Sequence, residues 1–196
     1  MSEDIHLNPA SVKAYAGQAQ ENFQSIRTEL DNLVSDAVGV KYYGQNAFDF
    51  KTKCGQMAAD LANALTTDMG RISESVRTAT SNISAALGGS PVTIEFNGAT
   101  VSPPAVPGDD GTVGASVVQL ESFKTTVKTH FTAISDFFSD HLRSLEQTEW
   151  TSTAKDNAVQ GVRSFTTGAK NKVDETSSEM INAIDEQIQA LNRANQ

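Results

Sequence analysis

Apolar side chains recur every three or four residues along four long stretches of the chain. This spacing places them on one face of a helix and predicts four long amphipathic helices. The first apolar stripe follows Asn8-Pro9 and stops at Gly39. Asn8 suits the cap of a helix and Pro9 its first position. The stripe consists of Val12, Tyr15, Ala19, Phe23, Ile26, Leu30, Leu33 and Ala37.

The second stripe follows the turn Tyr42-Tyr43-Gly44. The sequence Gly88-Gly89-Ser90-Pro91 predicts a firm end to its helix, because glycine favours a helix C-terminus and proline cannot continue the helix. Its members are Ala47, Phe50, Cys54, Met57, Leu61, Leu65, Ile72, Val76, Ala79, Ile83 and Ala86.

The third helix is expected to open near Asp110-Gly111-Thr112, and the fourth to follow Trp150-Thr151-Ser152. The third stripe comprises Val113, Val117, Leu120, Val127, Phe131, Ile134, Phe138, His141 and Leu145, widened by Phe123 and Phe137. The fourth comprises Ala154, Ala158, Val162, Phe165, Ala169, Val173, Met180, Ala183, Ile184, Ile188 and Leu191. A short polar tail, residues 192–196, is expected to follow it.

These patterns divide the chain into a first helical hairpin (1–90), a connector (91–111) and a second helical hairpin (112–196). Within the connector, β-forming residues flank Asn97-Gly98, which predicts a small β-hairpin over 92–101. The alternative is an unstructured linker. A two-stranded ribbon is marginal by itself and would need to lie against a helix.

The two hairpins form an internal repeat, because Trp150 follows Tyr42 by 108 residues and the apolar stripes then coincide. Phe50 aligns with Ala158, Cys54 with Val162, Met57 with Phe165, Leu61 with Ala169 and Leu65 with Val173. Two similar hairpins in one chain predict an all-α fold, a fused pseudo-dimer forming a four-helix bundle. Parallel and antiparallel packing of the hairpins both remain open at this point.

Charge and composition disfavour several classes of partner and location. A net charge of -9 disfavours nucleic acid and anionic membrane surfaces as partners. No run of eighteen apolar residues occurs, so no membrane span is expected. The acidic first residues, Met1 to His6, lack the pattern of a secretory signal, so any export is expected to use another route.

The sequence lacks several common catalytic and metal-binding patterns. The histidines, His6, His130 and His141, are at least eleven residues apart, and no Glu-X-X-His occurs within the four predicted helices. Neither a Gly-X-Ser-X-Gly motif nor a glycine-rich phosphate loop is present. Cys54 and His141 lie on apolar stripes and are expected to be buried in the core. The prediction is therefore a protein without enzymatic activity, cofactor or metal.

A helix, an aromatic–X–small turn and a second helix, in two acidic units, resemble the Trp-X-Gly family of early-secreted-antigen-like proteins. These are substrates of the type VII secretion system in actinobacteria and firmicutes. The second hairpin keeps Trp150, has Ser152 for the glycine, and places Phe165 fifteen residues on, where relatives often have Phe. The first hairpin keeps Gly44 and has Tyr42 for the tryptophan.

The resemblance implies a dimer-like pair of antiparallel hairpins, here within one chain, and hence a monomeric pseudo-dimer. It also implies that the groove beside the turn residues Tyr42, Gly44, Trp150, Ser152 and Phe165 is recognised by the secretion machinery ATPase, together with a co-secreted protein. The alternative is that the aromatic residues only close the end of the core.

One departure from the family is a missing export motif, a Tyr followed four residues later by Asp or Glu. Here Tyr15 leads to Ala19, Tyr42 to Asn46 and Tyr43 to Ala47. Two other functions therefore remain open. A cytoplasmic helical adaptor or chaperone fits the missing motif. A membrane-active helical toxin is disfavoured because the helices lack a face rich in Lys and Arg.

Overall fold

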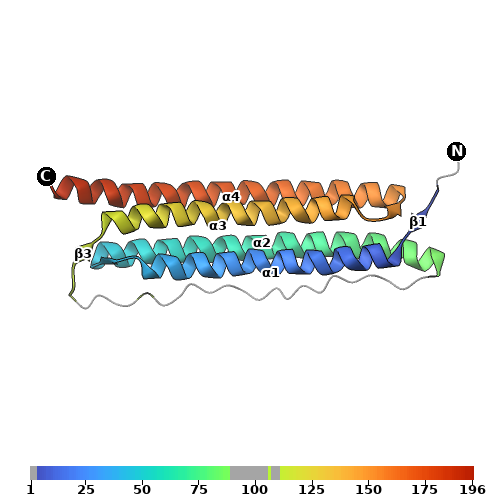
Figure 1. The fold of residues 1–196 in the computed structure, drawn as a ribbon, viewed down its shortest axis with the longest axis horizontal. Helices are drawn as coiled ribbons and strands as arrows, with labels where there is room; N and C mark the ends of the chain where they lie inside the picture. Colours follow the sequence, from blue (N-terminus) through green and yellow to red (C-terminus); the bar gives the residue numbers. More distant parts are fainter. Residues whose placement is uncertain (1–3, 89–105, 107–110) are drawn as a thin grey trace. The chain divides into compact units, whose positions relative to one another are not determined.

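The structure, a computed structural model, describes residues 4–88, 106 and 111–196, and long α-helices make up most of them. The helices are α1 (Pro9–Gly39), α2 (Gln45–Leu87), α3 (Val117–Glu146) and α4 (Thr153–Ala194) (Figure 1). The described part of the chain therefore has the predicted all-α, four-helix class.

Four strands of two residues each accompany the helices within the described residues. They are β1 (His6–Leu7), β2 (Tyr42–Tyr43), β3 (Gly114–Ala115) and β4 (Trp150–Thr151). They form two antiparallel pairs, β1 with β4 and β2 with β3. Each pair joins the segment before one hairpin to the turn of the other hairpin.

The chain divides into two compact units, and every helix contributes a portion to each. Unit 1 contains residues 4–26, 65–88 and 135–171. Unit 2 contains residues 27–64, 106, 111–134 and 172–196. In unit 1 the turn of the second hairpin lies with the open end of the first hairpin, and unit 2 has the converse arrangement. Within each unit the hairpins are therefore antiparallel.

The predicted apolar stripes supply the core of each unit. The large, fully buried side chains of unit 1 are at most 1% exposed. They are Phe23, Ile26, Leu65, Ile72, Phe138 and Leu145. Those of unit 2 include Leu30, Leu33, Leu120, Ile134, Met180 and Ile184. Cys54 is also buried, as predicted, and burial raises the pKa of its thiol to about 12.

The ends of α1 and α2 follow the sequence prediction. Asn8 Oδ1 accepts from the backbone N–H of Ala10 at 3.0 Å, so Asn8 caps α1 and Pro9 is its first residue. At the other hairpin end, α2 stops at Leu87 and Gly88 adopts φ +76°. Glycine reaches this left-handed conformation without strain, which explains the stop.

The prediction for the start of the third helix was wrong. Helix α3 begins at Val117 rather than near residues 110–112, and Val113 is 82% exposed instead of buried. The reason is that Gly114 and Ala115 pair with β2, and Ser116 then caps the helix by accepting from Gln119 N at 3.3 Å. Backbone groups committed to a strand cannot join the helix.

Three smaller details also bear on the prediction. Helix α4 extends to Ala194, so residues 192–194 are helical rather than part of a tail. Ala86 is exposed in the last turn of α2. The β-hairpin expected over 92–101 lies outside the described residues.

Candidate recognition sites at the two helical turns

The turn of the second hairpin, in unit 1, is organised around a buried tryptophan. Trp150 is only 2% exposed and belongs to an apolar cluster with Val12, Ile83 and Ala158. Leu7, Ala79 and Ala154 pack against this cluster. The indole ring therefore closes one end of the core, as the sequence predicted, and is itself inaccessible to a partner.

Glu149 ties this turn to the start of α1. Its carbonyl accepts from Asn8 N at 2.8 Å, and its backbone N–H donates to Ser11 Oγ at 2.8 Å. Its carboxylate also accepts from Asn8 Nδ2 at 2.5 Å. Together with the β1–β4 pairing, these bonds clasp the first hairpin to the turn of the second.

Ser152 acts as the cap of α4. It is 8% exposed, and its Oγ accepts from Lys155 N at 3.1 Å. A serine oxygen at this position satisfies one of the backbone donors that a helix start leaves unpaired. Ser152 thus replaces the family glycine with a residue that has its own structural role.

The turn of the first hairpin, in unit 2, is organised around Tyr42. This side chain is 6% exposed, its ring centroid lies 6.0 Å from that of Phe50, and its hydroxyl donates to Gln187 Oε1 at 2.8 Å. Burial raises the pKa of the Tyr42 hydroxyl. Tyr42 therefore fills the position of Trp150 while its polar end reaches α4.

Gly44 follows in a conformation that favours glycine. Its φ is +104°, and a Cβ added there would lie 3.3 Å from Val113 Cγ1. Both the left-handed backbone and the close valine restrict this position to glycine.

The 108-residue repeat extends to the hydrogen bonds of the two turns. Ser116 N donates to Lys41 O at 3.0 Å, which repeats the bond from Asn8 to Glu149. Lys41 N donates to Gln119 Oε1 at 2.9 Å, which repeats the bond from Glu149 to Ser11. Helices α1 and α3 begin at equivalent positions, and so do α2 and α4. Each unit thus builds the same clasp from different side chains.

At each turn, one lysine caps the C-terminus of the helix that precedes the turn. The sequence analysis missed both lysines. Lys155 Nζ donates to the carbonyls of Glu146 at 3.0 Å and Thr148 at 2.8 Å. Lys51 Nζ donates to the carbonyl of Val38 at 2.9 Å, and burial lowers its pKa. A lysine soon after each turn is a signal that could have suggested this, because cations favour helix C-termini.

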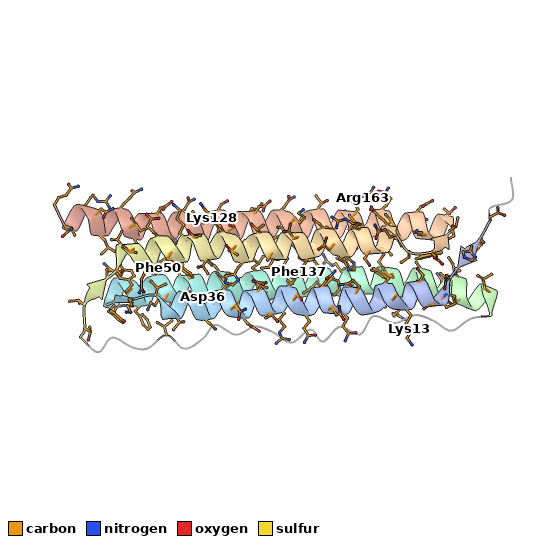
Figure 2. The ribbon with its side chains drawn as sticks, in the orientation of Figure 1. Lys13, Asp36, Phe50, Lys128, Phe137 and Arg163 are labelled. Atoms are coloured by element: carbon orange, nitrogen blue, oxygen red, sulfur yellow. The ribbon has the colours of Figure 1, made fainter. Side chains whose placement is uncertain are left out.

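An open depression lies beside each turn, and the two differ in charge. The depression of unit 1 is lined by Asp4, Glu146, Trp150, Thr151, Ser152, Thr153, Lys155, Asp156, Val159 and Arg163. Arg163, which Figure 2 labels, donates from its Nη2 to Glu146 Oε1 at 2.7 Å. The depression of unit 2 is lined by Tyr42, Tyr43, Gly44, Gln45, Asn46, Val113, Gly114, Ala115 and Leu191. Among these described lining residues none is charged.

The structure brings four of the five predicted turn residues to the two depressions: Tyr42 and Gly44 in unit 2, and Trp150 and Ser152 in unit 1. Phe165 is partly buried on α4 and is not among the residues that line the depression of unit 1. The sequence analysis missed Tyr43 and Val113, which are 49% and 82% exposed at the rim in unit 2.

Two further observations concern the described residues alone. They contain no group of three or more His, Cys, Asp or Glu side chains placed to hold a metal ion. No helix among them combines the length and the apolar content needed to cross a bilayer. In comparisons with family models, curated proteins and solved structures, the chain has no match.

Proposed function

We propose that this chain is a tandem member of the Trp-X-Gly family and acts as a non-enzymatic substrate, or substrate partner, of a type VII secretion system. It acts through protein–protein contacts with the secretion ATPase and a co-secreted protein. The observation that carries the proposal is the repeated turn. In both units a buried aromatic residue, a short strand clasp and an open depression occur at equivalent positions.

The accessible rim of the turns, rather than the aromatic residues, would make the contact. Trp150 and Tyr42 are 2% and 6% exposed, so each shapes its turn from inside. In unit 2, Tyr43 and Val113 present apolar surface beside an uncharged depression. Exposed apolar surface of this kind is typical of protein-binding sites, where charged residues are depleted at the centre.

The missing export motif favours a co-secreted partner that supplies the signal. The same absence favours the second candidate function, a cytoplasmic adaptor or chaperone that uses its turns to hold another helical protein. Both functions use the rims of the turns, and they differ in whether the chain leaves the cell.

Export is tested by immunodetection of the protein in culture filtrate from the native host and from a strain lacking the type VII ATPase. The proposal expects the protein in the filtrate of the first strain only. Retention inside both strains would contradict export and favour the adaptor.

The rim of unit 2 is tested by the double substitution Tyr43→Ser and Val113→Ser. The matched control is Val118→Ser, because Val118 is 79% exposed but does not line the depression. We expect at least a several-fold loss of filtrate protein for the double variant and none for the control, with unchanged helical circular dichroism in both. Equal export of both variants would exclude this rim as the recognition surface.

A further inference from the structure

Within the described residues, unit 1 has a polar interior that unit 2 lacks. Among the described residues, ten polar or charged residues are buried, and all except Lys51 belong to unit 1. The nine are Asn22, Asp68, Ser73, Thr80, Ser84, His141, Thr148, Ser152 and Thr166. Polar groups inside a helical core weaken it unless they are well paired.

Four of these polar side chains, and the indole of Trp150, have a buried polar atom without a hydrogen-bond partner in the described part of the chain. The unpaired atoms are Asn22 Nδ2, Ser73 Oγ, His141 Nδ1, Trp150 Nε1 and Thr166 Oγ1, and all lie in unit 1. A buried donor or acceptor left unpaired typically costs about 1–3 kcal/mol. Among the described residues, the buried polar groups of unit 1 are thus less completely hydrogen-bonded than those of unit 2.

His141 is one of these nine buried residues and is ionisable. It is fully buried on α3, and its ring stacks on Phe23 of α1 with the centroids 4.9 Å apart. Its Nε2 lies 3.2 Å from the hydroxyl of Tyr15, while Nδ1 is unpaired. An imidazolium ring must donate from both nitrogens, so these contacts suit only the neutral ring.

The contacts described for the His141 ring are with Tyr15 and Phe23, and neither of these side chains is charged. On α2, the buried carboxylate of Asp68 lies 3.8 Å from Arg71. On α4, Lys170 donates to Ser139 at 2.9 Å. On α3 itself, Asp140 pairs with Arg143 at 2.7 Å on the surface, and α1 faces the ring with the neutral Tyr15.

Burial accordingly lowers the pKa of His141 from its ordinary 6.5 to about 4. A depressed histidine pKa means that the folded unit binds fewer protons than the open one between these two values. Stability contributed by the neutral ring is therefore lost as the pH falls from about 6.5 towards 4. From pH 7 to pH 5 this linkage raises the opening equilibrium constant about 20-fold.

We propose that unit 1 is a proton-sensitive part of the chain, which opens on mild acidification through protonation of His141 while unit 2 stays folded. Opening of this kind separates α1 from α3 where Tyr15 and Phe23 hold the ring. It also exposes Trp150, which belongs to the same unit. The proposal stands independently of any role in secretion.

Amide hydrogen exchange of the full chain, read by mass spectrometry and corrected for the intrinsic effect of pH, tests it. Between pH 7 and pH 5 most carboxylates stay ionised, which isolates the histidines. We expect the opening constant to rise about 20-fold in the helical segments 9–26, 65–87, 135–146 and 153–171. Segments of unit 2 should change less than three-fold. An equal rise in both units would overturn the proposal.

The deciding variant is His141→Leu, because the equivalent position of the repeat already holds Leu33, which is fully buried. This variant should lose the pH dependence of unit 1. The control His6→Gln removes an exposed histidine of the same unit and should retain it. Retention of the full pH dependence in His141→Leu would contradict the proposal.

A measurement on the unmodified protein guards against a variant that fails to fold. The ring proton shifts of His141 are followed by NMR as the pH is lowered from 7.5 to 4.5. Above about pH 5 we expect no titration of the ring while the unit is closed, and a charged ring only in the open form. Titration near pH 6.5 with unit 1 still protected would overturn the proposal.

Discussion

Gly44 and Ser152 occupy equivalent positions of the two turns but serve their helices differently. Position 44 favours glycine because its φ is positive and because a Cβ there would lie too close to Val113. Ser152 has no positive φ and instead caps α4 with its hydroxyl. Both positions hold a small residue, and the structure gives a different reason for each.

This difference predicts the effect of Gly44→Ala. The substitution should destabilise unit 2 by about 1–3 kcal/mol, because alanine is strained at positive φ and its Cβ meets Val113. Urea unfolding followed by circular dichroism measures the loss. Gly17→Ala is the control: Gly17 lies inside α1 with nothing near its Cβ and should gain about 0.5–1 kcal/mol. A neutral Gly44→Ala would contradict the argument.

The capping role predicts that Ser152→Ala and Ser152→Gly differ. Loss of the hydroxyl in alanine should cost about 1 kcal/mol, whereas glycine at a helix cap costs only a few tenths. Thermal unfolding of both variants, compared with the unmodified chain, checks the order. If the alanine variant were the more stable of the two, Ser152 would not act through its cap.

At the residue scale, the sequence predicted what depends on local spacing. Burial of Tyr42 and Trp150, the cap at Asn8 and the stop at Gly88 all follow from neighbours in the chain. The bonds of Lys51 and Lys155 to helix carbonyls were missed. They depend on how closely the second helix returns along the first, which no local pattern specifies.

At the scale of elements, the strands β1 to β4 were the least predictable part of the fold. Two residues carry no alternation pattern, and each strand pairs with a segment far away in the sequence. The wrong start for α3 has the same origin, because Val113 continues the apolar spacing although residues 114–115 belong to β3. Only a contact with the other hairpin decides between helix and strand there.

The clasp between β1 and β4 predicts a local effect of Asn8→Ala. This change removes the cap of α1 and the bond from Asn8 Nδ2 to Glu149, so unit 1 should lose about 1–2 kcal/mol. Ser116→Ala removes only the equivalent cap in unit 2 and should cost about 1 kcal/mol there. Hydrogen exchange localises each loss. Loss of protection in the same unit for both variants would exclude two separate clasps.

A second link between elements joins α1 to α3 in unit 2. His130 Nδ1 lies 2.5 Å from Glu29 Oε2, and Nε2 lies 2.9 Å from Asp36 Oδ2, the residue labelled on α1 in Figure 2. Desolvation lowers the pKa of His130, but the hydrogen bonds to Glu29 and Asp36 outweigh it and the pKa is raised.

A raised pKa means that this contribution is present below the ordinary value of 6.5 and is lost as the pH rises through the folded pKa. Because the pair is partly exposed, we expect unit 2 to lose at most about 1 kcal/mol between pH 6 and pH 9. Urea unfolding across this range measures it. His130→Asn, which installs the residue of the equivalent position 22, should remove the dependence. An unchanged slope in that variant would assign the effect to another group.

At the scale of the whole molecule, the repeat was predictable and its asymmetry was only partly so. Aligned positions such as Cys54 and Val162, or Leu65 and Val173, are buried together, while Met57 and Phe165 are both partly buried. The sequence also placed His141 on an apolar stripe. It did not reveal that Asn22, Ser73 and Thr166 share its unit, because helices of uncertain phase do not determine which buried positions meet.

The composition of the two units also predicts the oligomeric state of the protein. Each unit contains portions of all four helices, and each turn is closed by a strand of the same chain. The contacts that single hairpins obtain by dimerising are therefore supplied by fusion, and we expect a monomer. Light scattering coupled to size exclusion should give about the chain mass of 20.9 kDa across a wide range of concentrations. A stable dimer would contradict this expectation.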